Sequence, residues 1–131
     1  MKRFFMPAQI AWSAPGQSHG VAHGAVFKRL LISGQPGVNE AGEVPDDLET
    51  QIGLAFENVL KVVEAGQMTA EDIVRIGAYV AAPRAYALFD RVRTRKLGAL
   101  NPVATYVETA GFSDARWRVL IDAEAIRDQS S

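Results

Sequence analysis

Residues 46–66, DDLETQIGLAFENVLKVVEAG, carry the clearest helix pattern in the chain. Apolar residues recur there at steps of three and four, which places them on one stripe of an α-helix: Leu48, Ile52, Ala55, Val59 and Val62. Acidic residues fill the first turn and Gly66 follows the last apolar residue, as suits the two ends of a helix. Phe56, Leu60 and Val63 widen the stripe. A broad apolar face on a helix about 30 Å long predicts a β-sheet beneath it.

The segments on either side of this helix have the composition of β-strands. Strands are expected at residues 4–13, 19–26, 30–32, 73–82, 105–109 and 116–126, with a turn near Lys28 and Arg29. A second helix is expected over residues 85–97, ending at Gly98. This order predicts one domain, residues 1–131, of the α+β class, with both helices on one face of a mixed sheet. If the other face is apolar, it must pack against another copy of the chain.

The composition argues against several classes of protein. The 131 residues include no cysteine, so neither disulfides nor thiolate chemistry is available. A formal net charge of −1 argues against a general binder of nucleic acids or of membrane surfaces. The N-terminal segment is broken by Pro7, which makes it a poor signal peptide. No apolar run approaches the roughly 20 residues of a membrane span, so a cytoplasmic protein without a membrane partner is expected.

The two histidines, His19 and His23, are candidates for a metal site or for acid–base chemistry. Two imidazoles are too few for a metal ion, and no further ligand pattern accompanies them. No metal is therefore expected, and hydrogen-bonded or surface histidines are the simpler interpretation. His19 alone could act as a general base or contact a ligand.

Two groups of charged residues have both a structural and a functional interpretation. The basic residues at the end of the second predicted helix suit a solvated face beside the negative helix terminus, with an anion or nucleic-acid contact as the alternative; they are Arg91, Arg93, Arg95 and Lys96. Asp122 and Glu124 alternate with apolar residues, so they share one face of the last strand. They could face water, or one of them could orient a water molecule or a proton in a pocket.

A series of short motifs, taken in order, resembles one protein family. The motifs are SGQ (33–35), GEV (42–44), ENVL (57–60) preceded by Gln51, EAG (64–66), DIV (72–74), NP (101–102) and EAI (124–126). Each is weak alone, but the ordered set covers residues 13–126, which is nearly the whole chain. It resembles the RidA family, whose members are also called YjgF or L-PSP endoribonuclease-like proteins.

The resemblance implies a chorismate-mutase-like α+β fold and a homotrimer. The sheets of the three protomers would face one another in a barrel-like core, with clefts for a small-molecule substrate between neighbours. Active members of the family hydrolyse reactive enamines and imines, such as 2-aminoacrylate, to a ketoacid and ammonia. They need no cofactor.

The family pattern Pro-Ala-Arg-Thr/Ser corresponds here to residues 102–105, PVAT, so Ala104 stands where the family arginine grips the substrate carboxylate. Alanine cannot form that bidentate pair. Thr105 and Tyr106 follow it as expected substrate contacts. The acidic position in the last strand matches Asp122, which would be the catalytic residue that orients the attacking water.

The remaining expected substrate contacts come from other segments. The family tyrosine aligns near Gln17 and the family asparagine near Asp90, and His19 follows in the same loop as Gln17. Ser33 and Gly34 match the family directly and would offer backbone groups. Arg116 or Arg118 could supply a cation in place of the missing arginine, and the alternative is a substrate that is not an α-carboxylate. Trp117 beside these arginines is expected in core or interface packing.

Three hypotheses follow for function. The first is a divergent RidA-like deaminase of an enamine, an imine or a related small nitrogen compound. The second is a trimer that binds small ligands in the same clefts without catalysis. The third, the endoribonuclease or translation-inhibitor activity in the family name, is favoured least, because the chain has no basic groove and no evident acid–base pair for phosphodiester cleavage. A nucleic-acid partner is therefore not expected.

Overall fold

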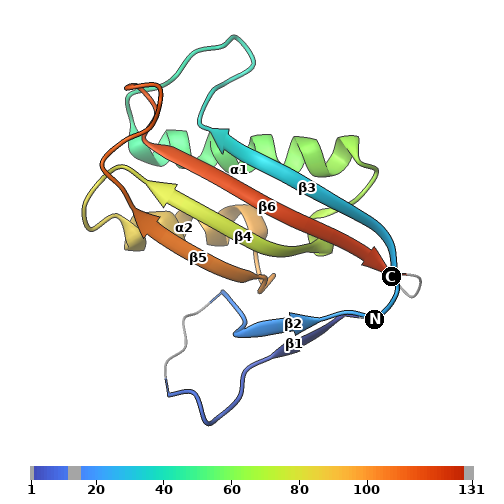
Figure 1. The fold of residues 1–131 in the computed structure, drawn as a ribbon. Helices are drawn as coiled ribbons and strands as arrows, with labels where there is room; N and C mark the ends of the chain where they lie inside the picture. The colour runs from blue at the N-terminus through green and yellow to red at the C-terminus, as the bar shows by residue number, and fades with distance from the viewer. Residues whose placement is uncertain (1, 12–15, 129–131) are drawn as a thin grey trace.

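The computed structural model describes residues 2–11 and 16–128. Its helices are α1 (Leu48–Ala65) and α2 (Tyr86–Leu97), with a 3₁₀ turn at Ala70–Asp72. Its strands are β1 (Arg3–Phe5), β2 (Gly20–Ala22), β3 (Val26–Pro36), β4 (Ile73–Val80), β5 (Val103–Glu108) and β6 (Val119–Asp128). The main sheet has four strands in the order β3-β6-β4-β5 (Figure 1). It is mixed, because β4 and β5 run parallel while β6 is antiparallel to both β3 and β4.

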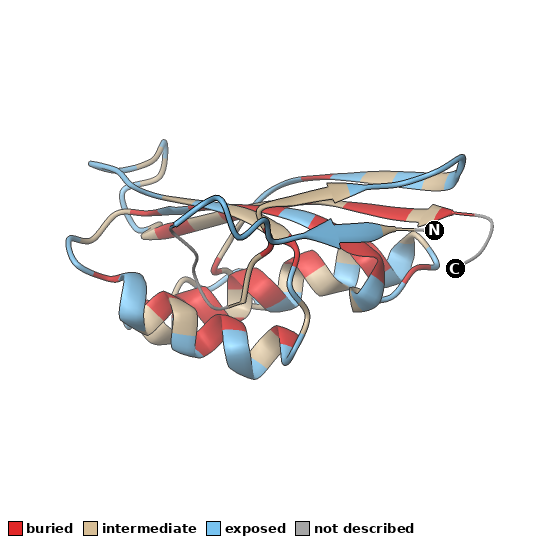
Figure 2. Cartoon of the chain, turned by 90° about the horizontal axis from the view of Figure 1, so that it is seen from below, coloured by how far each residue is buried: buried red, intermediate tan, exposed pale blue. Residues whose placement is uncertain are grey.

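Both helices cover the same face of this sheet, as expected (Figure 2). Ile52, Phe56 and Val59 of α1 are almost completely buried and belong to one apolar core with Ile76 of β4 and Ile121 of β6. Each buried side chain of this size contributes about 1.5–3 kcal/mol relative to an exposed one. The predicted α+β class is therefore confirmed, and the helix with the clearest sequence pattern also contributes to the centre of the core.

Both ends of α1 are stabilised by residues next to the helix in sequence, whereas the start of α2 is stabilised by a residue of a distant strand. The Asp47 carboxylate caps α1 by accepting a hydrogen bond from the Thr50 backbone N–H at 2.9 Å. Gly66 ends the same helix and donates to the carbonyl of Val62. Helix α2 has no such side chain at its own N-terminus. Glu108 of β5 accepts hydrogen bonds there from the backbone N–H groups of Arg84 and Ala85, both at 3.1 Å.

The opposite face of the sheet is not covered by any described element. Leu31 has 66% of its surface exposed there, and Tyr79 and Val107 are also exposed. Asp122 and Glu124 lie on this open face in neighbouring outward positions of β6, as the alternation in the sequence predicts. Asp122 pairs with Arg75 of β4 and Glu124 pairs with an arginine of β3, so the face mixes apolar side chains with ion pairs.

Several predicted strand boundaries are wrong. The observed boundaries of β3, β5 and β6 depend on pairing with strands that are distant in sequence. No turn occurs near Lys28, because β3 continues through it in antiparallel pairing with β6. The same pairing extends β6 to Asp128, beyond the expected end at 126. Strand β5 begins at Val103 because it pairs with Arg75 of β4. The first strand is shorter than expected, and the part of that prediction in residues 12–13 lies outside the described residues.

The expected start of the last strand at Arg116 is also wrong. The buried amide of Gln51 in α1 donates to the Arg116 carbonyl at 3.0 Å and accepts from the Arg118 backbone N–H at 2.9 Å. These backbone groups therefore bond a helix side chain before β6 begins at Val119. Neither helix of the described residues is long and apolar enough to cross a bilayer.

Candidate functional site

The loop that carries the N-terminal site residues is fixed to the start of β5. The Ser18 hydroxyl donates to the Asn101 carbonyl at 2.8 Å, and the Ser18 backbone N–H donates to Pro102 at 3.2 Å. Ser18 is buried by these contacts. They bring Gln17 and His19 beside Ala104, although more than eighty residues separate them in sequence.

An open cleft of about 280 Å³ lies between this loop and the sheet edge. Gln17 and His19 line one side of it, and Ala104 and Thr105 of β5 line the other. Arg75 reaches the cleft from β4. The expected contacts of the N-terminal loop and of β5 therefore do share one site.

A smaller cavity of about 20 Å³ shares Gln17, Ala104 and Thr105 with the cleft. It lies on the helix side of the sheet, because its other walls come from β4 and α2. Its volume has room for about one oxygen-sized group. Aromatic rings and the side chain of Arg93 complete its lining.

Tyr106 contributes its ring to this cavity. Its ring centroid lies 5.0 Å from that of Tyr86 and 5.3 Å from that of Phe89. Its hydroxyl donates to the Glu108 carboxylate at 2.8 Å. Burial, together with this hydrogen bond to Glu108, raises the pKa of Tyr106 far above its ordinary value. Tyr106 therefore stays protonated and serves as an apolar wall rather than as a base.

Arg93 lines the small cavity, although the sequence favoured a solvated position for it over an anion contact. The expectation of a solvated face is right for Arg91 and Arg95, which are exposed and bond Glu49. It is wrong for Arg93, whose side chain is only 8% exposed. The sequence could have predicted this burial, because position 93 lies four residues after the apolar Phe89 and so on the same face of the helix.

The guanidinium of Arg93 is held from one side only. Its Nε and Nη2 donate to one carboxylate oxygen of Asp90 at 3.0 and 2.8 Å, and Nη2 also donates to the Thr94 hydroxyl at 3.1 Å. Its Nη1 is buried without an acceptor among residues 2–11 and 16–128. Gly16 covers the guanidinium so closely that a Cβ there would overlap it, and its φ of +80° also requires glycine.

This contact changes the interpretation of Asp90. Its carboxylate binds the guanidinium of Arg93 rather than lining the cleft or the cavity itself. Asp90 is thus joined to the cavity lining through Arg93. The expected contact at Asp90 stays a prediction, and the residue of α2 that lines the cavity lies three positions further along.

Asp122 lies on the open face of β6, next to the cleft rather than in its lining. Its carboxylate is 2.9 Å from the Arg75 guanidinium and is 24% exposed. A Cβ at Gly77, its partner across the strands, would come within 2.5 Å of the carboxylate. Asp122 therefore lies over a glycine. Arg75, which binds Asp122, is also part of the lining of the cleft.

Ser33 and Gly34 are not brought to the cleft within one chain. They belong to β3, whereas Ala104 and Thr105 belong to β5, and these strands form the two edges of the sheet. Three strand spacings separate the edges, or about 14 Å. Both residues are exposed on their own edge.

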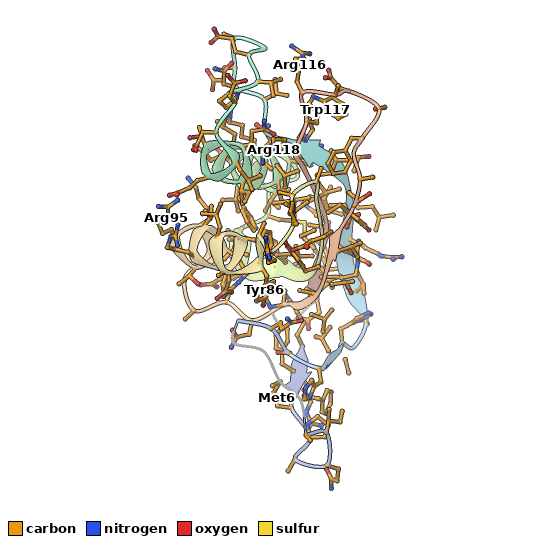
Figure 3. All side chains as sticks on the ribbon, turned by 90° about the vertical axis from the view of Figure 1, so that its left-hand side faces the viewer. Met6, Tyr86, Arg95, Arg116, Trp117 and Arg118 are labelled. Atoms are coloured by element: carbon orange, nitrogen blue, oxygen red, sulfur yellow. The ribbon has the colours of Figure 1, made fainter. Side chains whose placement is uncertain are left out.

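Arg116 and Arg118 lie beside the N-terminus of α1, away from Tyr86 and the cavity (Figure 3). Arg116 is exposed and binds Asp114 at 2.8 Å. Arg118 reaches the carbonyl of Asp46 at 3.4 Å. Neither lines the cavity or the cleft as these are described, so neither supplies a cation at Ala104 from within the same chain.

The two histidines have separated environments. His19 is half-buried and lines the cleft, whereas His23 is exposed, with Nδ1 2.8 Å from the Gly24 carbonyl oxygen. Across the described ranges, no three residues of the types His, Cys, Asp and Glu are grouped so that they could hold a metal ion.

Comparison with known proteins identifies the family. The family model described as Endoribonuclease L-PSP matches residues 13–127. The chain belongs to the L-PSP family, also called the RidA or YjgF family. The resemblance seen in the short sequence motifs is thereby confirmed.

Individual relatives agree with this membership. YyfB of Yersinia pestis, a Rid family protein described as of unknown function, is 26% identical with a TM-score of 0.85, over 96% of this chain and 98% of that chain. TdcF of Escherichia coli, solved with bound serine, is 26% identical with a TM-score of 0.72, over 88% and 94% of the two chains. A RutC family protein of Haemophilus influenzae is 44% identical over 52 residues, which spans 39% of this chain and 40% of that relative.

Proposed function

We propose that this L-PSP family member is a hydrolytic deaminase of small enamines or imines, acting in clefts between the subunits of a homotrimer. The observation that carries the proposal is the position of Asp122. This carboxylate, at the family's water-orienting position, lies beside a cleft of about 280 Å³ and is joined to it by Arg75. The bound serine in TdcF supports a small nitrogen compound as the ligand class.

The separation of Ser33 and Gly34 from the cleft supports the trimer. In one chain these residues sit on the β3 edge, and the cleft sits at the β5 edge. In the trimer proposed here, the β3 edge of a neighbouring copy would lie against this cleft and complete it. The exposed Leu31, Tyr79 and Val107 on the open face would be covered by the same contact.

The chemistry needs one water molecule and no redox partner. An enamine first becomes the imine by proton transfer to carbon. Water then adds to the C=N carbon, and Asp122 accepts the proton that this water loses. That proton passes to the nitrogen and gives a carbinolamine, C(OH)NH2. The hydroxyl proton then moves to the amino group as the C–N bond breaks, so the products are a carbonyl compound and ammonia. Asp is one methylene shorter than the usual Glu, so the water would lie closer to the backbone of β6.

The test compares two carboxylates on the same strand face. Asp122→Asn should lower ammonia release from 2-iminopropionate and larger imines, generated in situ by an amino-acid oxidase, by about 100-fold or more. Glu124→Gln is the matched control, because Glu124 points to the same face but binds Arg29 at 2.8 Å. It should retain turnover. Sedimentation of both variants would show that assembly is unchanged.

Three results would contradict the proposal in different ways. Turnover by Asp122→Asn equal to that of the wild type would exclude its role with water. Ligand binding without acceleration of any imine would favour a trimer that binds without catalysis. A strongly salt-dependent affinity for RNA would favour the nuclease activity in the family description.

A further inference from the structure

Arg93 presents an unusual combination of burial and unused hydrogen-bonding capacity. A guanidinium has five N–H donors and cannot be deprotonated in a protein. Asp90 and Thr94 accept from Nε and Nη2, but both donors of Nη1 lack an acceptor within the described ranges. A buried charged donor without an acceptor is costly, so this group calls for a partner that residues 2–11 and 16–128 do not provide.

The location of Arg93 indicates what that partner is. Its side chain lines the small cavity that also contacts Ala104, the position where the family pattern has its carboxylate-binding arginine. The alanine side chain leaves space at this point of β5, and Arg93 occupies the facing wall from α2. A guanidinium is therefore present at the small cavity, but it belongs to α2 and not to β5.

The charge around the two spaces favours an anion. The described residues that line the cleft and the cavity include two arginines, Arg75 and Arg93, and no aspartate or glutamate. Asp90 and Asp122 bind these arginines from outside the lining. Each guanidinium is thus oriented by an acid, and Nη1 of Arg93 in addition has no acceptor among the described residues.

We propose that Arg93 binds the carboxylate of the substrate in place of the arginine missing at position 104, so that the substrates are small α-carboxylate imines or enamines. This proposal rests on the proposed function for the reaction, but not for the binding. One carboxylate oxygen enters the small cavity and accepts from Nη1, while the reacting carbon remains in the open cleft. Because Gly16 covers the guanidinium, entry of the oxygen requires Gly16 to move away from it.

The test measures binding without chemistry, by NMR titration of the full chain with propionate and with propionamide at constant ionic strength. These probes have nearly the same shape and differ in charge. The wild type should bind propionate tighter by a factor of about ten or more, as expected for hydrogen bonds to a charged group. In Arg93→Met this preference should disappear. Arg95→Met is the matched control on the same helix, since Arg95 points outward and binds Glu49, and it should keep the preference (Figure 3).

A relocated arginine distinguishes binding from a structural role. If Arg93 only supports the Gly16 loop, Arg93→Met should weaken both probes equally. If Arg93 binds the carboxylate, the double variant Arg93→Met/Ala104→Arg should recover the preference for propionate. Should Arg93→Met fail to fold, Arg93→Lys replaces it, and the ammonium paired with Asp90 should bind propionate about tenfold less tightly.

The outcomes separate the two proposals. An unchanged preference in Arg93→Met or Arg93→Lys overturns the role of Arg93, whatever the turnover of the wild type. No preference in the wild type overturns it as well. A preference that depends on Arg93, in a protein that hydrolyses none of the imines, upholds the carboxylate site and rejects the deaminase.

Discussion

Two ion pairs between arginine and aspartate differ in which partner is buried. One is Arg93–Asp90 at the cavity, and the other is Arg127–Asp72 near the C-terminal end of β6. Asp72 is the buried partner in the second pair, with a side chain only 6% exposed. It accepts from Arg127 at 2.7 Å and from the Thr69 backbone N–H at 2.9 Å, and Lys2 lies 3.6 Å away. In the first pair the arginine is buried at 8% exposure, while Asp90 is 30% exposed.

The two pairs also differ in whether the hydrogen-bonding groups of the buried partner all have partners. Every charged group at Asp72 has a partner, and Arg127 Nη1 additionally reaches the Gln67 carbonyl at 3.4 Å. Arg93 Nη1 has no acceptor in the described part of the chain. A saturated pair contributes to folding, because loss of either partner leaves a buried charge. A pair with spare donors contributes less to folding and keeps binding capacity for a ligand.

Substitution of Arg127 should have the largest effect on stability. Arg127→Met leaves the buried Asp72 carboxylate with a reduced set of donors, so the free energy of unfolding should fall by about 2–3 kcal/mol. Urea denaturation at one fixed protein concentration would measure it, because assembly also contributes to apparent stability. A loss no greater than that of the exposed-surface variant Arg91→Met would show that this pair is not structural.

The pH dependence of the same pair should give an intermediate effect. Burial alone would raise the pKa of Asp72, but the hydrogen bonds from Arg127 and Thr69 and the charges of Arg127 and Lys2 lower it below 3.8. Since the folded-state pKa is the lower one, this stabilisation is present above the unfolded pKa and is lost as pH falls through the folded pKa. The difference in unfolding free energy between wild type and Asp72→Asn should therefore shrink below about pH 4. A difference that stayed constant to pH 2.5 would argue against it.

Substitution of Arg93 should have the smallest effect on stability. Arg93→Met removes a buried charge with unused donors, and the partly exposed Asp90 that remains can be hydrated. The free energy of unfolding should stay within about 1 kcal/mol of the wild-type value. A loss as large as that of Arg127→Met, measured in the same urea series, would make the two pairs equivalent and remove the distinction drawn between them.

The sequence by itself determined the secondary structure that depends on local patterns. The helix at Leu48–Ala65 followed from apolar spacing and its end from Gly66, whereas Asp47 caps the helix instead of lying in its first turn as expected. The alternation in the last strand placed Asp122 and Glu124 on one face. The helix and the strand alternation depend on residues a few positions apart, which the sequence contains directly. The order of short motifs along the chain indicated the family, and the family implied the fold.

Only the tertiary structure decided the strand ends and the composition of the site. Strand β3 passes through Lys28 because β6 pairs with it along its length. Arg93 belongs to the cavity because the Gly16 loop and β5 close around α2 at that point. Ser33 and Gly34 lie at the edge opposite to Thr105 because the strand order is β3-β6-β4-β5. Burial of a charge and closure of a pocket are set by segments far apart in sequence, and local patterns carry no information about which segments meet.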